Sequence, residues 1–277
     1  MALETAVLAS GSSGNCIFVA GRNTGILIDA GLSGSRIEER MRSVGYDPAE
    51  LDALLLTHEH NDHISGAGVM SRRYNLPLYA SAETLAAGSD KLGNIGDDLL
   101  RPVGESFSLG EIDISTFSLP HDAASPRGYI LKEGGVKLGL ATDIGCITPE
   151  IVSSLQGCDI LLLESNHDQD LLRTGSYPPS LKRRIRSEQG HLSNIEAAEL
   201  LPRLLEGKEG GKPVVILSHL SQENNRPELA YITVKNSLQA AGWQVGEDVI
   251  LDCACRDEVA GPYSRSQNDR GGISRTG

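Results

Sequence analysis

Short apolar runs that end in a histidine or a carboxylate recur along this chain, and they limit its possible folds more than any other feature of the sequence. The run at residues 53–56 leads into THEHNDH, and later runs lead into His121, Asp143, Glu164 and His219. Such runs are typical of strands that are buried on both faces. Layered α/β folds place reactive groups at the ends of strands, because the sheet fixes positions and the loops carry the chemistry. The pattern therefore predicts an α/β fold with a functional site at the strand ends.

The rest of the sequence predicts alternating strands and helices. We expect strands in TAVLA, CIFVA, GILIDA, LPLYAS, EIDISTFSLP, CDILLLES, PVVILSHLS and VILDCAC, and a hairpin in GYILKEGGVKLGLATDIG. Helices are expected over residues 33–44, 64–74, 147–156 and 227–241, and within residues 191–205. The last of these has a clear start, because Ser193 and Glu196 form an S-x-x-E capping box.

Length, charge and cysteine content narrow the class of protein. No Pro- or Ser-rich linker divides the 277 residues, so we expect one domain over residues 1–263 and a disordered polar tail over residues 264–277. A net charge of -12 argues against a protein that holds nucleic acid through its overall charge, although a local basic site stays possible.

Without an apolar run of about 18 residues or a signal peptide, the chain is expected to be cytoplasmic, with no membrane partner. Its five scattered cysteines predict reduced thiols. The oligomeric state is not indicated.

The segment THEHNDH predicts a metal site. Residues two apart in an extended chain point to the same side, roughly 6.6 Å apart, so His58 and His60 can converge on one ion. Asp62 shares their parity but His63 does not, so the chain must turn after Asn61. A polar loop of hydrogen-bonding histidines is the alternative. Imidazole together with carboxylate suits zinc, manganese or iron.

The order of these residues resembles the metallo-β-lactamase superfamily, whose signature H-x-H-x-D-H is matched by His58, His60, Asp62 and His63. The resemblance covers nearly the whole chain and implies a four-layer αββα sandwich with its site along one edge of the two sheets. It also implies two divalent metal ions, Zn²⁺ or Mn²⁺ or possibly Fe, held by seven ligands. The implied ligands are His58, His60 and His121 for one ion, Asp62, His63 and His219 for the other, and Asp143 as the bridge. Asp62 could instead act as a base beside the ligands.

Two further residues resemble those of nuclease branches such as ribonuclease Z. Glu164 and His191 lie between Asp143 and His219, and the likeness implies that His191 protonates the leaving group with Glu164 orienting it. GHLSNIEAAELL, LSHLSQENNRPELA and ASGSSGNC are most similar to the WalJ/YycJ-type branch, which is implicated in DNA exonuclease activity. Ser193 and Asn194, in the same stretch as His191, are expected to contact the substrate.

A basic cluster in an acidic protein favours a phosphate substrate. LKRRIR, residues 181–186, precedes the His191 loop, and its basic side chains are expected to contact phosphate. These side chains are Lys182, Arg183, Arg184 and Arg186. A solvated helix face explains the cluster equally well.

The preferred function is a binuclear metal-dependent phosphodiesterase that acts on nucleic acid, with DNA attacked from an end. Two ions about 4 Å apart can lower the pKa of a shared water toward about 7 and neutralise charge on a phosphoryl oxygen. The second hypothesis is a small-molecule hydrolase of ester, lactone or thioester bonds, favoured by the acidic composition and by the scarcity of aromatic residues that could stack on bases. A metal-binding or redox module without hydrolysis is the third.

Overall fold

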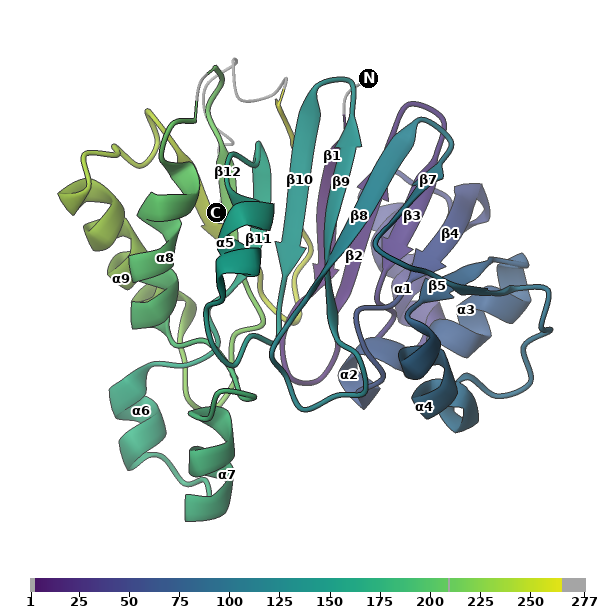
Figure 1. Ribbon diagram of the computed structural model, residues 1–277, viewed down its shortest axis with the longest axis horizontal. Helices are drawn as coiled ribbons and strands as arrows, with labels where there is room; N and C mark the ends of the chain where they lie inside the picture. The colour runs from purple at the N-terminus through teal and green to yellow at the C-terminus, as the bar shows by residue number, and fades with distance from the viewer. Residues whose placement is uncertain (1–2, 209, 266–277) are drawn as a thin grey trace.

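Within residues 3–208 and 210–265, which this computed structural model describes, two seven-stranded sheets lie face to face and helices cover the outer face of each (Figure 1). This is the four-layer αββα sandwich that the sequence predicts. Strand β14 ends at Ser264, the first residue of the tail that we expected to be disordered. Residues 266–277 of that tail lie outside the described part of the chain.

The first sheet has the strand order β14-β1-β2-β3-β4-β5-β6. Its strands are β1 (Glu4–Ala9), β2 (Cys16–Ala20), β3 (Gly25–Ile28), β4 (Leu51–Leu55), β5 (Leu78–Ala80), β6 (Leu100–Pro102) and β14 (Ala260–Ser264). Strands β3 to β6 are parallel to one another, so their carboxyl ends share one edge. On the outer face lie α1 (Gly34–Ser43), α3 (Ala67–Tyr74) and α4 (Ala82–Leu92), with the short α2 (Asn61–Ile64) and a 3₁₀ turn, Pro48–Glu50, in the connections.

The second sheet has the order β13-β12-β11-β10-β9-β8-β7. Its strands are β7 (Ser106–Leu109), β8 (Ile112–Ser118), β9 (Arg127–Glu133), β10 (Val136–Ala141), β11 (Ile160–Glu164), β12 (Val214–Ser218) and β13 (Ile250–Cys253). Strands β10 to β13 are parallel. Helices α5 (Pro149–Leu155), α8 (Asn194–Leu205) and α9 (Pro227–Ala240) cover its outer face, and α6 (Gln169–Thr174) and α7 (Pro179–Ile185) project from the edge at which the parallel strands end (Figure 1).

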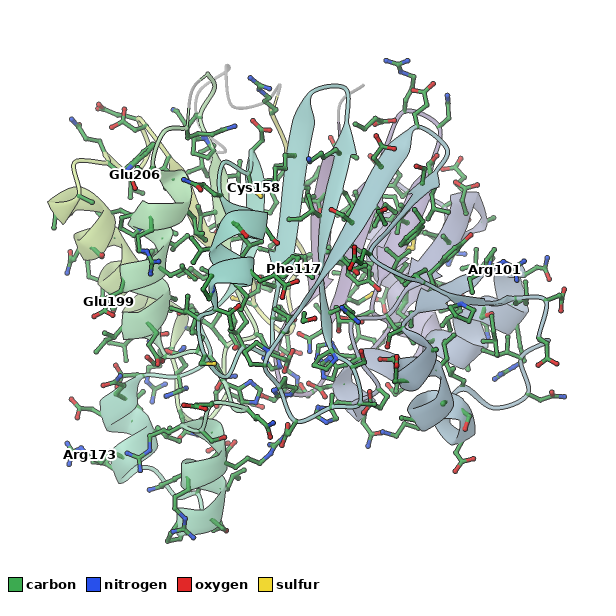
Figure 2. The ribbon with its side chains drawn as sticks, viewed as in Figure 1. Arg101, Phe117, Cys158, Arg173, Glu199 and Glu206 are labelled. Atoms are coloured by element: carbon green, nitrogen blue, oxygen red, sulfur yellow. The ribbon has the colours of Figure 1, made fainter. Side chains whose placement is uncertain are left out.

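Three apolar layers hold the sandwich together, and they explain why the strands are apolar throughout. Between the sheets, side chains such as Ile28, Tyr129 and Leu162 are buried from both directions. The helices of the outer layers are amphipathic. On α8, Leu200 is buried against the second sheet, while Glu199 is exposed on the far side (Figure 2). Alternating faces of each strand thus meet different apolar layers, which favours continuous apolar runs.

One predicted helix is interrupted. The sequence predicts a single helix over residues 64–74, but the structure has α2 before Gly66 and α3 after it. A β-carbon on Gly66 would lie 2.0 Å from the carbonyl oxygen of Leu32, so the chain passes too close to its neighbour for any other residue. The N–H of Gly66 donates to the carbonyl of Ala30 instead of continuing a helix. Helix α2 therefore starts at Asn61 and carries two of the predicted ligands.

Several short elements were not predicted from the sequence. They are α4, β6 and β7 in the Gly- and Asp-rich stretch before residue 111, and α6 and α7 in the stretch before His191. All five cysteines are free, as predicted. None of the helices in the described ranges has the length and apolar character needed to cross a bilayer.

Candidate metal centre

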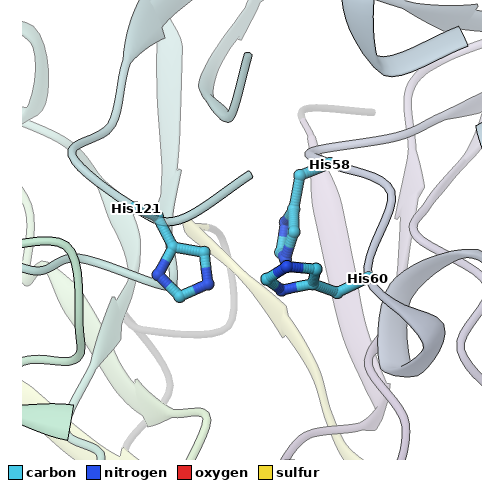
Figure 3. A group of neighbouring side chains, drawn as sticks. All are labelled: His58, His60 and His121. Atoms are coloured by element: carbon cyan, nitrogen blue, oxygen red, sulfur yellow. The ribbon is translucent and has the colours of Figure 1, made fainter. Parts of the chain in front are cut away.

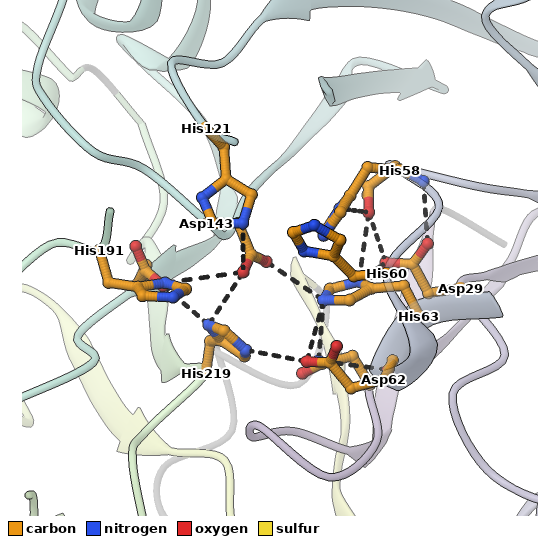
Figure 4. A network of polar contacts seen from close by, with 12 residues as sticks. Asp29, His58, His60, Asp62, His63, His121, Asp143, His191 and His219 are labelled. Atoms are coloured by element: carbon orange, nitrogen blue, oxygen red, sulfur yellow. Dashed lines mark hydrogen bonds and ion pairs between the residues drawn. The ribbon is translucent and has the colours of Figure 1, made fainter. Parts of the chain in front are cut away.

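The seven predicted ligands come together at the edge where the parallel strands of both sheets end (Figure 4). The first sheet supplies four of them, from the loop after β4 and from α2, and the second sheet supplies three, from the loops after β8, β10 and β12. In chain order they are His58, His60, Asp62, His63, His121, Asp143 and His219. Residues more than 150 positions apart in the sequence thus meet at one site, since His219 Nε2 lies 3.4 Å from Asp62 Oδ2.

Backbone strain marks three strand ends at this edge. Asp29, Asp143 and His219 have φ values of 58°, 65° and 56°, in the left-handed region that residues other than glycine rarely adopt. Each follows a strand of the parallel sets, and the N–H of His219 donates to Ser10 Oγ at 2.6 Å. Strained residues of this kind cluster at functional sites, where surrounding contacts hold them in place.

The first group of ligands is His58, His60 and His121, whose rings face one another (Figure 3) and whose ligand atoms lie within 4.8 Å of each other. Nδ1 of His58 lies 3.0 Å from Thr57 Oγ1, and Nδ1 of His121 lies 3.0 Å from the carbonyl of Gly190. Their Nε2 atoms are buried and have no hydrogen-bond partner among the described residues. Such orphaned buried atoms are rare, so these two nitrogens fit a bound cation.

His60 is oriented differently from the other two histidines of this group. Its Nε2 lies 3.2 Å from the carbonyl oxygen of Asp122. Because a carbonyl only accepts, this nitrogen must donate, which leaves Nδ1 of His60 with the free lone pair.

The second group is Asp62, His63 and His219. Nδ1 of His63 lies 2.7 Å from Asp29 Oδ2, and Nδ1 of His219 lies 2.8 Å from Glu164 Oε1. A carboxylate accepts these hydrogen bonds, so both rings keep the proton on Nδ1 and turn Nε2 toward Asp62, at 3.5 and 3.4 Å. Ligating histidines are commonly held in this way, with a carboxylate fixing the tautomer.

Asp143 lies between the two groups. Its Oδ2 is 3.2 Å from Nε2 of His63, and its Oδ1 is 3.6 Å from Nε2 of His121. A carboxylate that reaches one histidine of each group fits the bridging position expected from the sequence.

The charges of the centre favour cations. Burial lowers the pKa of His63, but the carboxylates of Asp29 and Asp143 outweigh it and hold that pKa well above its usual value. Burial also opposes protonation of His219, yet Asp143 and Asp62 raise its pKa to about 10. Burial raises the pKa of Asp143, and the facing His219 and His63 rings hold it well below its usual value. Buried carboxylates that stay charged and hold protons on the facing imidazoles this firmly also attract divalent ions.

Glu164 and His191 form a pair beside the ligands. Glu164 Oε1 lies 2.9 Å from Nδ1 of His191, while Oε2 accepts the N–H groups of Ile144 and Leu192 at 2.8 and 2.9 Å. Burial raises the pKa of Glu164, but the facing His191 and His219 rings lower it to about 2. Asp143, Glu164, His191 and His219 are also close enough to hold an ion. Since Nδ1 of both rings already meets Oε1 of Glu164, however, the carboxylate is engaged in orienting the two histidines.

Ser193 and Asn194, which we expected to contact the substrate, do not line the cavity at this site. Ser193 is the N-cap of α8, and its Oγ accepts the N–H of Glu196 while Glu196 Oε2 accepts the N–H of Ser193. Asn194 is buried and forms a reciprocal amide pair with Asn225, with both N–O distances 2.9 Å. Both side chains position the loop that carries His191.

The four basic residues of the cluster separate into different roles. Arg184 lies at the cavity and makes a bidentate ion pair with Asp122 at 2.6 and 2.8 Å. Lys182 Nζ donates to the carbonyls of Arg173 and Gly175, which ties α7 to the end of α6. Arg183 and Arg186 are exposed and do not line the cavity.

Sequence reasoning missed the residues that support the ligands. Asp29 accepts hydrogen bonds from His63 and from the Thr57 hydroxyl, and Thr57 in turn meets Nδ1 of His58. Asn15 Nδ2 lies 3.3 Å from Asp62 Oδ2. A signal for Asp29 was present, because it ends the apolar run GILI as the other site residues end theirs.

The centre opens into a cavity of ≈ 210 Å³. Candidate ligands and His191 line it, together with residues of the α6–α7 segment. The lining residues are Ser12, His60, Asp62, His121, Asp143, Asn166, Tyr177, Leu181, Arg184, Ile185, His191, His219 and Ser221.

Comparison with known proteins agrees with this geometry. A family described as the beta-lactamase superfamily domain matches residues 24–219. Exodeoxyribonuclease YycJ of Bacillus anthracis is 39% identical over 249 residues, which cover 89% of this chain and 93% of that protein. Exodeoxyribonuclease WalJ of Streptococcus pneumoniae is 41% identical over 246 residues, which cover 87% of this chain and 90% of that protein. The crystal structure of the metallo-beta-lactamase fold protein YhfI from Bacillus subtilis, 15% identical, has a TM-score of 0.69 and covers 94% of this chain and 99% of its own. The chain therefore belongs to the metallo-β-lactamase superfamily of hydrolases, in the branch of YycJ and WalJ.

Proposed function

We propose that this hydrolase is a binuclear metal-dependent phosphodiesterase that removes nucleotides from an end of DNA. The observation that carries the proposal is the Glu164–His191 pair, which stands beside a full set of seven candidate ligands with its histidine at the cavity. A metal site alone serves many hydrolases, but a separate proton donor suits a leaving group as basic as a sugar oxygen. The names of the YycJ and WalJ relatives support DNA as the substrate.

The ligands would hold two divalent ions, of zinc, manganese or iron. When bound, these ions supply a nucleophile from water at neutral pH and neutralise charge on the phosphoryl oxygens. His58, His60 and His121 would hold the first ion, Asp62, His63 and His219 the second, and Asp143 would contact both.

The chain itself supplies the proton for the leaving oxygen. Glu164 Oε1 accepts a hydrogen bond from Nδ1 of His191, which fixes the ring so that Nε2 is the nitrogen free to face the cavity. His191 can then give its Nε2 proton to the departing sugar oxygen as the ester bond breaks. Arg184, which stays paired with Asp122, brings a positive charge to the cavity that can attract a phosphate of the strand.

End-labelled DNA and RNA of one sequence, incubated with the protein and with Zn²⁺, Mn²⁺ or Fe²⁺ in turn, test this function. The expected result is progressive shortening of DNA from one end, and loss of that activity in Asp143→Ala together with loss of bound metal by elemental analysis. Hydrolysis of small esters or thioesters with no cleavage of either nucleic acid would replace the proposal with the small-molecule hydrolase.

A further inference from the structure

The α6–α7 segment gives the cavity an apolar wall. Tyr177, Leu181 and Ile185 line it together with candidate ligands and His191. Tyr177 and Leu181 are partly exposed, whereas Ile185 is buried. A phosphodiester needs only charged and polar partners, so an aromatic and aliphatic wall points to another part of the substrate.

This wall is fixed to the catalytic loops rather than free to move. The N–H of His191 donates to the carbonyl of Ile185 at 2.9 Å, and the carbonyl of Gly190 meets Nδ1 of His121. A β-carbon on Gly190 would lie 2.2 Å from the Ile185 carbonyl oxygen, so the two segments are in close contact. The Arg184–Asp122 ion pair adds a second tie to the loop of His121. The wall is therefore held ready at a set distance from the ligands, which lowers the entropic cost of binding.

Tyr177 is the residue in this wall with the most specific chemistry. Phe, Trp and Tyr make up only 4% of the chain, yet one of them lies at the mouth of the reaction site. Every nucleobase has a flat face that stacks on an aromatic ring, and such stacking is worth about 1–3 kcal/mol per base. A cavity of ≈ 210 Å³ is smaller than the usual small-molecule site, which favours one nucleotide over a base pair as its occupant.

We propose that Tyr177 stacks on the base of the terminal nucleotide of a single strand, with Leu181 and Ile185 against that nucleotide and its phosphate directed to the ligands. This inference rests on the proposed function and names its substrate as an unpaired strand end. One stacked nucleotide between the wall and the ligands implies that mononucleotides are released one at a time. It also implies that a duplex end must open by at least one base pair before it is cut.

The test removes the base and the tyrosine ring separately and together. Single-stranded DNA with an abasic tetrahydrofuran terminal residue is compared with normal DNA on the metal-loaded wild type, Tyr177→Ala and Tyr177→Phe. Either change alone is expected to lower kcat/KM by about 5- to 150-fold, and the two changes together should cost little more than one. Tyr177→Phe should behave as the wild type, because stacking needs the ring and not the hydroxyl. An abasic end that slows wild type and Tyr177→Ala by the same factor would overturn the role of Tyr177.

A binding measurement keeps this inference separate from the proposed function. Calorimetry with dAMP and with deoxyribose 5-phosphate reports the base contact without any hydrolysis. The wild type should bind dAMP more tightly by a similar factor, and Tyr177→Ala should lose that preference while its thermal unfolding stays cooperative. Equal affinity of the wild type for both ligands would reject the base subsite, even if the protein proves to be a nuclease. Failure to cut any nucleic acid, with the dAMP preference intact, would instead reject the nuclease and keep the subsite.

Discussion

Asp29 supports both groups of ligands at once, although it contacts the proposed ions through other residues. It binds Nδ1 of His63 directly and reaches Nδ1 of His58 through the Thr57 hydroxyl. Its own backbone is in the left-handed region, where Asp and Asn are tolerated better than most residues. The single carboxylate thus fixes one imidazole in each group.

Asp29→Asn is expected to lower metal affinity by about 10- to 100-fold, because the amide keeps the shape and backbone conformation but loses the charge that holds the histidine protons. Competition with a chelating dye measures the affinity. Asp52→Asn serves as the control, since Asp52 Oδ2 accepts the N–H of Gly25 in an exposed part of the chain. Equal affinities for the two variants would contradict this support role.

His191→Ala is expected to keep both metals and to lower turnover on DNA by about 10²- to 10⁴-fold, because the proton donor is gone. The loss should shrink on a p-nitrophenyl phosphodiester, whose leaving group needs no proton. Metal content by elemental analysis checks the first expectation and the two rates check the second. A similar loss on both substrates would leave His191 a positioning residue.

His167 gives the fold an acid sensitivity of its own. The residue is 2% exposed, its Nδ1 has no hydrogen-bond partner among the described residues, and burial lowers its pKa from 6.5 to about 4. Between these two pH values the unfolded chain therefore binds a proton on His167, whereas the folded protein keeps the ring neutral. The neutral His167 ring contributes its full share to the free energy of unfolding above about pH 6.5. This share, about 3 kcal/mol, is lost as the pH falls toward 4.

His167→Gln should accordingly lose less unfolding free energy than the wild type between about pH 7 and about pH 4.5. Urea unfolding of both proteins at the two pH values gives the comparison. Subtracting the loss in the variant from the loss in the wild type removes the effect of the candidate metal ligands, because they titrate in both proteins. Parallel losses in the two proteins would show that His167 is not the group responsible.

Among the elements, α8 connects stability to the site, because its capping box begins two residues after His191. Ser193→Ala removes the oxygen that accepts the N–H of Glu196 and should lower the free energy of unfolding by about 1 kcal/mol. Turnover should also fall, since the loop of His191 loses its anchor. Thr148→Ala at the N-cap of α5 is the matched control. Thr148→Ala should lower the free energy of unfolding, measured by chemical denaturation, by a similar amount and leave turnover unchanged.

Elements with strong local signals were predicted from the sequence, and elements that depend on distant contacts were not. The capping box located α8, and the apolar runs located the central strands. Helix α7 has seven residues and is tied down by Lys182 and by the Arg184–Asp122 pair, whose partners are 62 positions apart. The break at Gly66 likewise depends on a carbonyl from another segment. The candidate ligands came from the resemblance to the H-x-H-x-D-H signature, and the structure brings these residues close to one another.

At the scale of the molecule, the candidate metal centre joins the two halves of the sandwich. The first sheet presents His58, His60, Asp62 and His63, and the second presents His121, Asp143 and His219. An ion held by both halves binds the folded state and not the unfolded chain, so it stabilises the sandwich. Zn²⁺ or Mn²⁺ at a hundredfold excess over its Kd should raise the Tm by at least about 5 °C. Thermal unfolding with and without a chelator measures this, and an unchanged Tm would place the ions outside the shared edge.

Strand β14 pairs with β1, so that Ser264 lies opposite Glu4. A ribosome makes β14 about 13 to 50 s after β1 at ordinary elongation rates, because most of the described chain lies between the two strands. For that interval one edge of β1 has unsatisfied backbone groups, and open strand edges are templates for aggregation. The nascent chain is therefore expected to bind chaperones. Slow codons anywhere between the two strands would prolong the exposure, and slow codons after β14 would not.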